Sequence, residues 1–269
     1  MLVDNNRTTE TDKRVDGDVE GVAFSSYLCV RLVAKSKRFS NVDFKYTIFD
    51  SCYFRKCVFD SCDFTGCRFV GTNLVGSSFT GCKFDYASFE RTQVENEILD
   101  TQCPAYENLK IRFARSLRVN YQQIGDSISA NKAIEVELAA TEIHLHKAWS
   151  SNESYYRKKY NGVGRIRVYF QWLNFKVLDF VWGNGESTLK LVRSLVYAFV
   201  AMTIIDVSLY RDTTQVSSYF SALAETPQIF LGTIVPAHYA KPYLTIISLL
   251  RLISFGFFMS IIIKRFNRR

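Results

Sequence analysis

The sequence has little of what enzymes use for chemistry. It contains only 3 histidines among 269 residues, and two of them, His144 and His146, are two positions apart and therefore point to different faces of a helix. It has no glycine-rich phosphate-binding loop, no metal-ligand spacing, and no nucleophile placed with a base and an orienting group. We therefore expect no catalytic residues, no bound metal and no cofactor.

The N-terminal residues lack the apolar run of a secretory signal peptide. Residues 1–18 are charged and polar, which is typical of a mobile tail, and residues 21–33 favour a strand. We expect residues 1–38 to form this tail, followed by a strand that caps the next domain or is swapped with a neighbouring subunit.

From residue 44 to residue 94 an apolar residue returns at every fifth position. The series is Phe44, Phe49, Phe54, Phe59, Phe64, Phe69, Leu74, Phe79, Phe84, Phe89 and Val94. A small residue precedes most of them by two positions: Thr47, Cys52, Cys57, Cys62, Cys67, Thr72, Ser77, Cys82, Ala87 and Thr92. Helices repeat about every 3.6 residues and strands about every 2, so a period of five indicates a repeat array.

If each pentad forms one side of a square coil, a turn takes about 20 residues and successive turns stack about 4.8 Å apart. The large residues then fill the axis, and the small ones fit the inward corners. This pattern resembles the pentapeptide-repeat family, which implies a right-handed quadrilateral β-helix over residues 39–100. Most of the seven cysteines fall on this register, so we expect packed, reduced thiols rather than disulfides or metal ligands.

Some pentapeptide-repeat proteins mimic DNA, which requires an acidic coil. Residues 43–97 carry 8 acidic and 6 basic residues, and this near-neutral balance argues against such a role. After the coil, residues 101–167 predict a helical hairpin, with one helix from Pro104 to Gln123 and a second from Ser127 to Tyr160. Its basic residues indicate either a solvated face or a site for an anionic ligand, and the candidate ligand-binding residues are Arg112, Arg115, Arg118, Lys132 and Lys147.

The last third of the chain is strongly apolar, although the mean hydropathy of the whole chain is −0.03. Residues 168–187 are aromatic and amphipathic, which favours an interfacial helix and turn beside inner-membrane lipids. Residues 191–210 and 242–264 are each long enough to cross a hydrocarbon core of about 30 Å. Basic residues precede the first span and follow the second, so we expect a multi-pass protein of the bacterial inner membrane with both termini in the cytoplasm.

Between the spans, residues 217–236 contain a short helical pattern and then a loop with a glycine. This order resembles the two-transmembrane potassium-channel family: Tyr219, Phe220 and Ser221 are similar to the start of its pore helix, Gly232 to a filter glycine, and Gly256 to its inner-helix hinge. The resemblance implies a pore domain over residues 188–269. The filter and pore residues would be Thr226, Gln228, Ile229, Phe230, Leu231, Gly232 and Thr233.

The filter segment departs from potassium channels because Pro227 interrupts it and only one glycine is present. A wider cation pathway, an anion pathway and a hydrophobic constriction at Ile229, Phe230 and Leu231 all stay open, as does a plain hairpin between two anchors. Arg251 lies within the second span, where a charged residue usually has a partner. Its depth favours Glu225, with Asp206 as the second choice, and this pairing would hold the loop in place.

One pore loop cannot enclose a pathway, so we expect a homotetramer. Small channels with cytosolic sensor domains resemble effectors of bacterial antiviral defence, in particular the channel component of the two-gene Hailong antiphage system. That resemblance implies membrane depolarisation, a nucleotide or oligonucleotide signal, and a partner protein that produces it. The alternatives are a membrane-anchored interaction scaffold and a housekeeping or osmotic conductance.

Overall fold

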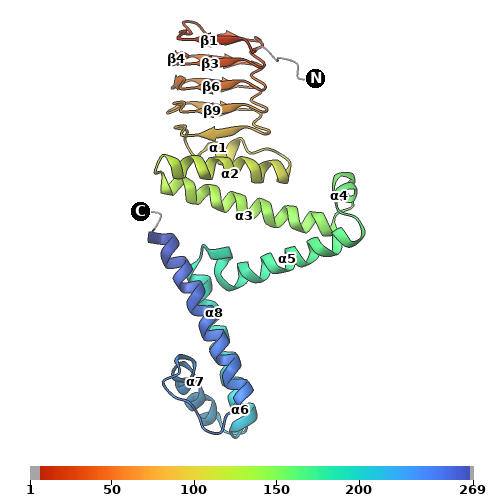
Figure 1. Cartoon of the computed structure of the whole chain (residues 1–269), viewed down its shortest axis with the longest axis vertical. Coiled ribbons are helices and arrows are strands. Elements are labelled where there is room, and N and C mark those ends of the chain that lie inside the picture. The colour runs from red at the N-terminus through yellow and green to blue at the C-terminus, as the bar shows by residue number, and fades with distance from the viewer. Residues whose placement is uncertain (1–6, 267–269) are drawn as a thin grey trace. The chain divides into compact units, whose positions relative to one another are not determined.

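The computed structural model describes residues 7–266. The chain divides into two compact units, one ending at Val168 and the other beginning at Tyr169. The first unit contains a stack of short strands followed by helices, and the second contains helices alone (Figure 1). The N-terminal part of the expected tail and the basic C-terminal residues Arg268 and Arg269 lie outside the described residues.

The strands of the first unit form a square coil, as the pentad pattern predicts. Three sides are parallel sheets, and the fourth is a column of single bridges that joins Ala23, Asp43, Asp63 and Lys83. The strands are β1 Thr9–Thr11, β2 Val19–Glu20, β3 Leu28–Val30, β4 Val33–Lys35, β5 Arg38–Ser40, β6 Ile48–Asp50, β7 Tyr53–Arg55, β8 Val58–Asp60, β9 Arg68–Val70, β10 Ser78–Thr80 and β11 Ser88–Glu90.

The turn of the coil takes 20 residues over most of its length. Leu28 pairs with Ile48, and Ile48 pairs with Arg68. The axial phenylalanines therefore lie directly above one another: the ring centroids of Phe44 and Phe64 are 5.1 Å apart, and those of Phe64 and Phe84 are 5.0 Å apart, with nearly parallel planes. This spacing matches the distance between neighbouring strands. The prediction of a β-solenoid with a phenylalanine axis is confirmed.

The coil begins well before residue 39, and the expectation of a tail and separate strand over residues 1–38 is wrong for the described part of that segment. Strands β1 to β4 form the first sides of the coil. The apolar register continues here with Cys29 and Ala34 at the centre, both buried. Large residues, Tyr27 and Leu32, stand two positions before them and pack against the same core. At these two sides of the coil the central residue is small and the residue two positions before it is large. A search for a phenylalanine at every fifth position therefore misses them.

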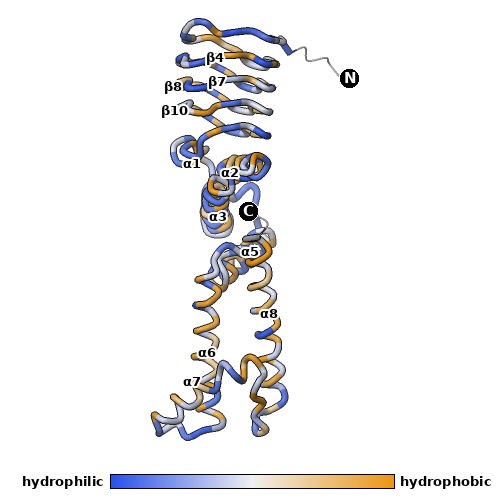
Figure 2. Tube along the Cα trace, turned by 90° about the vertical axis from the view of Figure 1, so that its left-hand side faces the viewer, coloured by the Kyte–Doolittle hydropathy of each residue, from blue (hydrophilic) through white to orange (hydrophobic). Residues whose placement is uncertain are grey.

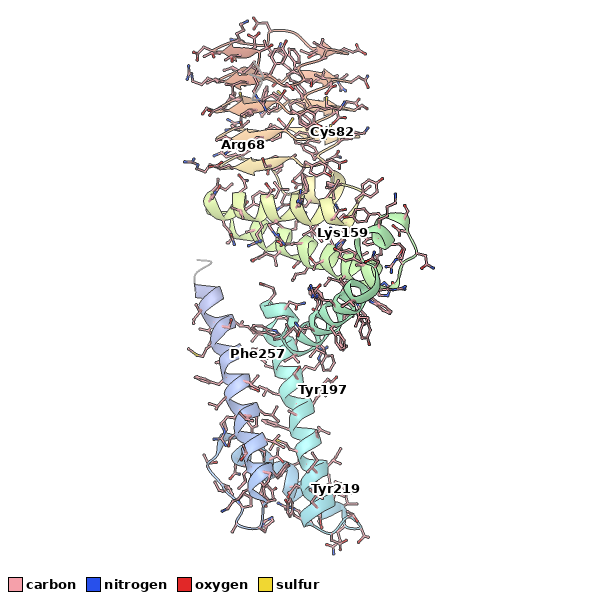
Figure 3. All side chains as sticks on the ribbon, turned by 45° about the vertical axis from the view of Figure 1, so that its right-hand side comes forward. Arg68, Cys82, Lys159, Tyr197, Tyr219 and Phe257 are labelled. Atoms are coloured by element: carbon pink, nitrogen blue, oxygen red, sulfur yellow. The ribbon has the colours of Figure 1, made fainter. Side chains whose placement is uncertain are left out.

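The small residues of the coil have a hydrogen-bonding role that the sequence analysis missed. From Thr47 to Cys82, the thiol or hydroxyl donates to the carbonyl oxygen 23 residues earlier: Cys52 Sγ lies 3.2 Å from the oxygen of Cys29, Cys62 Sγ 3.3 Å from that of Phe39, and Thr72 Oγ1 3.1 Å from that of Phe49. Figure 3 labels Cys82, which makes the same contact with Phe59 at 3.5 Å. Cysteine, threonine and serine are therefore interchangeable donors at this corner.

Helix α2 (Glu107–Gln123) covers the last rung of the coil. The Asn120 side chain accepts from the amide of Thr92 at 2.7 Å and donates to its carbonyl at 2.8 Å. The Gln123 side chain accepts from the amide of Arg91. A short helix, α1 (Ile98–Thr101), leads to Gln102, whose side chain bonds the backbone of Cys82 and Phe79. These amide side chains replace the missing next turn and so close an edge that would otherwise be open to other strands.

Helix α3 (Ser127–Ser150) packs against α2 and ends ten residues earlier than predicted. Ser151 is extended, and its hydroxyl accepts from the amide of Glu153, which starts a new short helix, α4 (Ser154–Lys159). The prediction of one continuous helix to Tyr160 is therefore wrong. Serine side chains that bond to a nearby backbone amide compete with helix propagation.

The remaining helices are α5 (Gly162–Trp182), a 3₁₀ turn η1 (Gly183–Gly185), α6 (Thr188–Tyr210), α7 (Val216–Leu231) and α8 (Lys241–Phe266). In the second unit, α6 and α8 are apolar along most of their lengths, and α7 lies against one end of both (Figure 2). This unit holds the segment that the sequence analysis singled out for function.

Candidate functional site

Two helices of the second unit are long and apolar enough to cross a membrane, by length and composition. They are α6 and the α8 segment Lys241–Ile263. Only 28% and 11% of their most apolar stretches are buried inside the chain. The core helix of a soluble protein is mostly buried, so this exposure weakly suggests that the second unit associates with a membrane.

Helix α7 extends further than the sequence predicts. The helix continues through Pro227 to Leu231 and ends at Gly232, which has the left-handed conformation (φ 81°) of a helix C-cap. The segment from Thr226 to Leu231 is therefore helical, and the expectation that it forms a loop is wrong. Carbonyl groups within a helix are bonded to amides further along the chain, so only those of the last turn are free.

Arg251 of α8 binds the end of α7. Its Nε lies 2.5 Å from the carbonyl oxygen of Phe230, and its Nη2 lies 3.5 Å from that of Ile229. The left-handed turn favours glycine at position 232, and a Cβ atom there would lie 2.6 Å from Nη1, so any side chain would also push the guanidinium aside. The guanidinium thus caps the negative end of the helix dipole.

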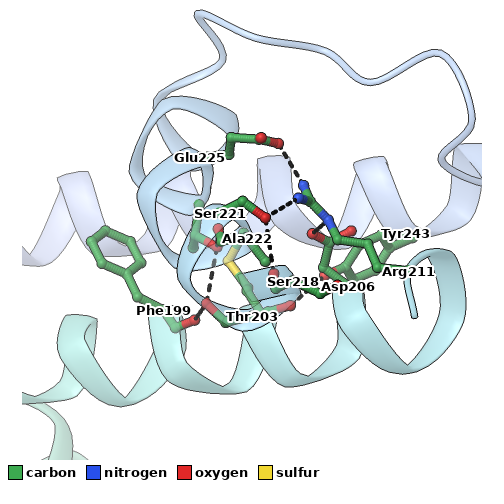
Figure 4. Close-up of polar contacts among 11 residues, drawn as sticks. Phe199, Thr203, Asp206, Arg211, Ser218, Ser221, Ala222, Glu225 and Tyr243 are labelled. Atoms are coloured by element: carbon green, nitrogen blue, oxygen red, sulfur yellow. Dashed lines mark hydrogen bonds and ion pairs between the residues drawn. The ribbon is translucent and has the colours of Figure 1, made fainter. Parts of the chain in front are cut away.

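The predicted ion pair between Arg251 and Glu225 is wrong. Glu225 binds Arg211, a loop residue after α6, with Oε2 and Nη2 2.5 Å apart. The same guanidinium binds Asp206 Oδ2 at 2.8 Å and Ser221 Oγ at 2.9 Å (Figure 4). Asp206, which was the second choice as the partner of Arg251, is only 2% exposed and belongs to this cluster. Arg211 lies just beyond the first span, so depth within the spans does not identify it as the partner of Glu225.

The predicted pore residues divide into two groups. Thr226, Ile229 and Phe230 are buried within the chain: the Thr226 hydroxyl lies 3.1 Å from that of Thr203 on α6, and Ile229 and Phe230 join the cluster of Met202, Tyr239 and Ile247. Gln228, Leu231 and Thr233 are exposed. A constriction made by Ile229, Phe230 and Leu231 together is therefore not formed, since only Leu231 is free to face a pathway.

Gly256, the predicted hinge, lies at an exposed position of α8, with no atom within 4 Å of where a Cβ would be. Beside it, Phe257 stacks on Trp182 at the end of α5, with ring centroids 4.3 Å apart (Figure 3). The glycine is thus not required for packing within one subunit, and a hinge stays a prediction.

The predicted anion-binding residues do not form one free patch. Arg115 and Arg118 share the two oxygens of Glu137, at 2.8 and 2.9 Å, and Lys132 binds Asp100 at 2.5 Å. Lys147 lies 3.9 Å from Glu153, and the Arg112 guanidinium lies 5.9 Å from the centre of the Tyr86 ring. An anionic ligand at these helices would have to compete with carboxylates of the chain itself.

Comparison with known proteins supports the assignment of the coil in the first unit to pentapeptide repeats. The family model for pentapeptide repeats matches residues 38–74 and 62–96, with 8 copies of the repeat. No curated protein matches the sequence. Among solved structures, the chain is similar to trypsin-treated QnrB1, a plasmid-mediated fluoroquinolone resistance protein, at 17% identity and a TM-score of 0.16; the match covers 33% of this chain and 54%, about half, of the other. The chain therefore contains a pentapeptide-repeat domain.

Proposed function

We propose that the chain is one subunit of a homotetrameric ion channel in the bacterial inner membrane, with the pentapeptide-repeat coil in the cytoplasm. The observation that carries the proposal is the arrangement of α7 between the two apolar helices, with its C-terminal end bound by Arg251 of α8. A plain hairpin between two membrane anchors needs no such structure.

The length of α7 supports a re-entrant segment. Its 16 residues extend about 24 Å at 1.5 Å per residue, which is less than the hydrocarbon core of about 30 Å. Polar contacts join it to α6, through Thr203 and Thr226, and to the loop before it, through Arg211 and Glu225. Backbone that ends at membrane depth is tolerated only where it is buried in protein or lines a water-filled cavity.

Four copies would complete the pathway. The exposed Gln228, Leu231 and Thr233 at the end of α7 are then available to neighbouring subunits or to the axis. We do not propose potassium selectivity, because a filter needs a run of free carbonyls and α7 is helical up to Gly232.

The proposed role is a bacterial antiviral-defence effector that depolarises the membrane. A nucleotide or oligonucleotide from a signal-producing partner would gate it at the basic residues of α2 and α3. This part of the proposal follows from the resemblance to defence channels. The ligand would have to displace an internal carboxylate, as at Arg115 and Arg118, which already hold Glu137.

Ion flux from liposomes tests this function. The purified full chain is reconstituted with ion substitution, with and without oligonucleotides of mixed length. We expect flux that an oligonucleotide changes in wild type and leaves unchanged when Arg115 and Arg118 are both replaced by Glu. No flux from a folded tetramer under any condition would favour the alternative of a membrane-anchored scaffold. Flux that ignores every oligonucleotide would favour a housekeeping or osmotic conductance.

A further inference from the structure

A cavity of about 430 Å³ lies within the first unit, between the last turn of the coil and the helices that follow it. Asp85 and Tyr86 of the coil form one wall, the start of α2 from Ala105 to Leu109 forms another, and Lys147, Glu153, Tyr155 and Tyr156 close it. Its volume falls in the range of small-molecule sites, about 300–1,000 Å³. None of the residues assigned to the pore lines it.

Four tyrosines surround this cavity. Tyr86, Tyr106 and Tyr155 are 58%, 70% and 42% exposed, whereas Tyr156 is buried at the back. Large aromatic side chains that stay exposed around a hollow are typical of binding sites. Two of the rings already attract cations of the chain, since Arg112 lies over Tyr86 and Lys159 over Tyr155 at 5.6 Å. Neither of these two basic residues lines the cavity.

The charged groups that line the cavity are mostly acidic. Asp85, Glu107 and Glu153 face a single base, Lys147, whose nearest approach to Glu153 is 3.9 Å. Burial, followed by the charges of Glu153 and Glu107, raises the pKa of the Tyr156 hydroxyl to about 12. The lining therefore favours a positive charge.

One oxygen of Glu107 lacks a partner. Its Oε2 is inaccessible to solvent, and no hydrogen bond to it is formed within residues 7–266. Glu107 stands in the first turn of α2, where the helix dipole favours a negative charge. A buried carboxylate oxygen without a donor is costly, and a positive charge held in the cavity would offset part of that cost.

We propose that this cavity binds an organic cation, a primary ammonium or guanidinium group, which is attracted by the carboxylate of Glu107 and lies against the tyrosine rings. Aromatic rings combined with carboxylates are the usual receptors for such groups. The group belongs either to a free polyamine or amino-acid amide or to a lysine or arginine side chain of a protein. The inference does not depend on ion conduction.

Calorimetric titration of the full chain in detergent tests the site, with spermidine and argininamide as probes and 1,8-octanediol as an uncharged control. We expect both cations to bind and the diol not to bind. Glu107→Gln, which keeps the shape of the side chain, and Tyr86→Leu should each weaken binding at least tenfold. Glu135→Gln is the matched control because it removes the same charge at an exposed position of α3, and it should leave affinity unchanged.

A tripeptide amide, Ala-Arg-Ala, distinguishes the two sources. Binding of the free cations that depends on Glu107 supports a small-molecule ligand. Binding of the tripeptide alone, again dependent on Glu107, supports a protein side chain. The proposal is overturned if neither the free cations nor the tripeptide binds. It is also overturned if Glu135→Gln weakens binding as much as Glu107→Gln. Thermal unfolding of each variant checks that the coil is intact, and a variant that unfolds is replaced by Tyr155→Leu at the opposite wall.

Discussion

The guanidinium of Arg251 lies on the carbonyl oxygen of Phe230, so a positive charge from α8 occupies the negative end of α7. In a re-entrant helix, the C-terminal carbonyls would otherwise attract cations. Within the described part of the chain, Arg251 has no acidic partner. The charge is therefore not cancelled by a carboxylate, and it changes the sign of the field at this point.

The first prediction is that Arg251 disfavours cations in the conducting state. Arg251→Gln should shift the permeability ratio toward cations, because the helix end then regains its negative character. Arg251→Lys keeps the charge but cannot bridge two carbonyls in the same fork, so the ratio should change less while thermal stability falls. Reversal potentials in asymmetric salt measure the ratio. An unchanged permeability ratio in Arg251→Gln would show that the arginine only stabilises the end of α7 and does not affect ion selectivity.

Double-mutant cycles should separate the two arginines. Glu225 binds Arg211 and not Arg251, so the cost of Glu225→Gln and Arg211→Gln together should be smaller than the sum of the single costs. Glu225→Gln and Arg251→Gln should be additive within about 0.5 kcal/mol. Tetramer stability in detergent gives these values. Coupling between Glu225 and Arg251 would instead support the ion pair between them that their similar depths in the membrane predict.

In the coil, replacing an axial residue should cost more stability than replacing a corner residue. Phe64 is stacked between Phe44 and Phe84, and Phe64→Ala should cost about 3–5 kcal/mol through lost burial and a cavity. Cys62→Ala removes one weak donor to the carbonyl of Phe39 and should cost about 1 kcal/mol. Thermal unfolding of both variants tests the difference. Similar losses of stability would contradict the axial packing.

The cap on the coil depends on one amide. Asn120 is fully buried and bonds both the amide and the carbonyl of Thr92, so Asn120→Leu leaves two backbone groups unsatisfied. We expect it to destabilise the first unit by about 2–6 kcal/mol, since each of the two unsatisfied buried groups costs about 1–3 kcal/mol. Gln122→Leu at an exposed position of the same helix is the control. Chemical denaturation compares them, and equal stabilities would exclude a capping role.

Two cysteines of the coil, Cys29 and Cys52, should be unreactive. Burial is the main cause that raises the pKa of the Cys29 thiol to about 11 and that of Cys52 to about 12. A raised pKa keeps each thiol protonated at neutral pH, and the reactive thiolate forms only as the pH approaches these values. Maleimide labelling of the folded protein at pH 7 should therefore spare both residues, whereas denatured protein should be labelled fully. Rapid labelling of Cys52 without unfolding would mean that the coil opens.

The sequence predicts the coil well because one period controls every inward position and the chemistry of each pentad is local. It fails at the start of the coil, where Tyr27 with Cys29 and Leu32 with Ala34 exchange large and small volumes. It also misses the cap, because the contact between Asn120 and Thr92 joins distant segments and follows no local pattern.

For the candidate site, the sequence identifies the two apolar helices and the importance of Arg251. It does not identify the partners of Arg251, since depth along a helix says nothing about which side chain reaches which carbonyl. Pro227 is misleading for a related reason: a proline removes one donor, but packing of Thr226, Ile229 and Phe230 against α6 and α8 keeps the helix intact.

Conductance through Gly232→Val is the most direct test that α7 lines an ion pathway. The substitution places a branched side chain at a left-handed position, where even its Cβ would lie 2.6 Å from the Arg251 guanidinium, so either the guanidinium must leave the end of α7 or the backbone there must move. Gly256→Ala has open space around it and is the control. In planar bilayers, we predict that wild type and Gly256→Ala conduct while Gly232→Val, with its tetramer intact, loses or grossly alters conductance. Identical currents from all three proteins would contradict the account.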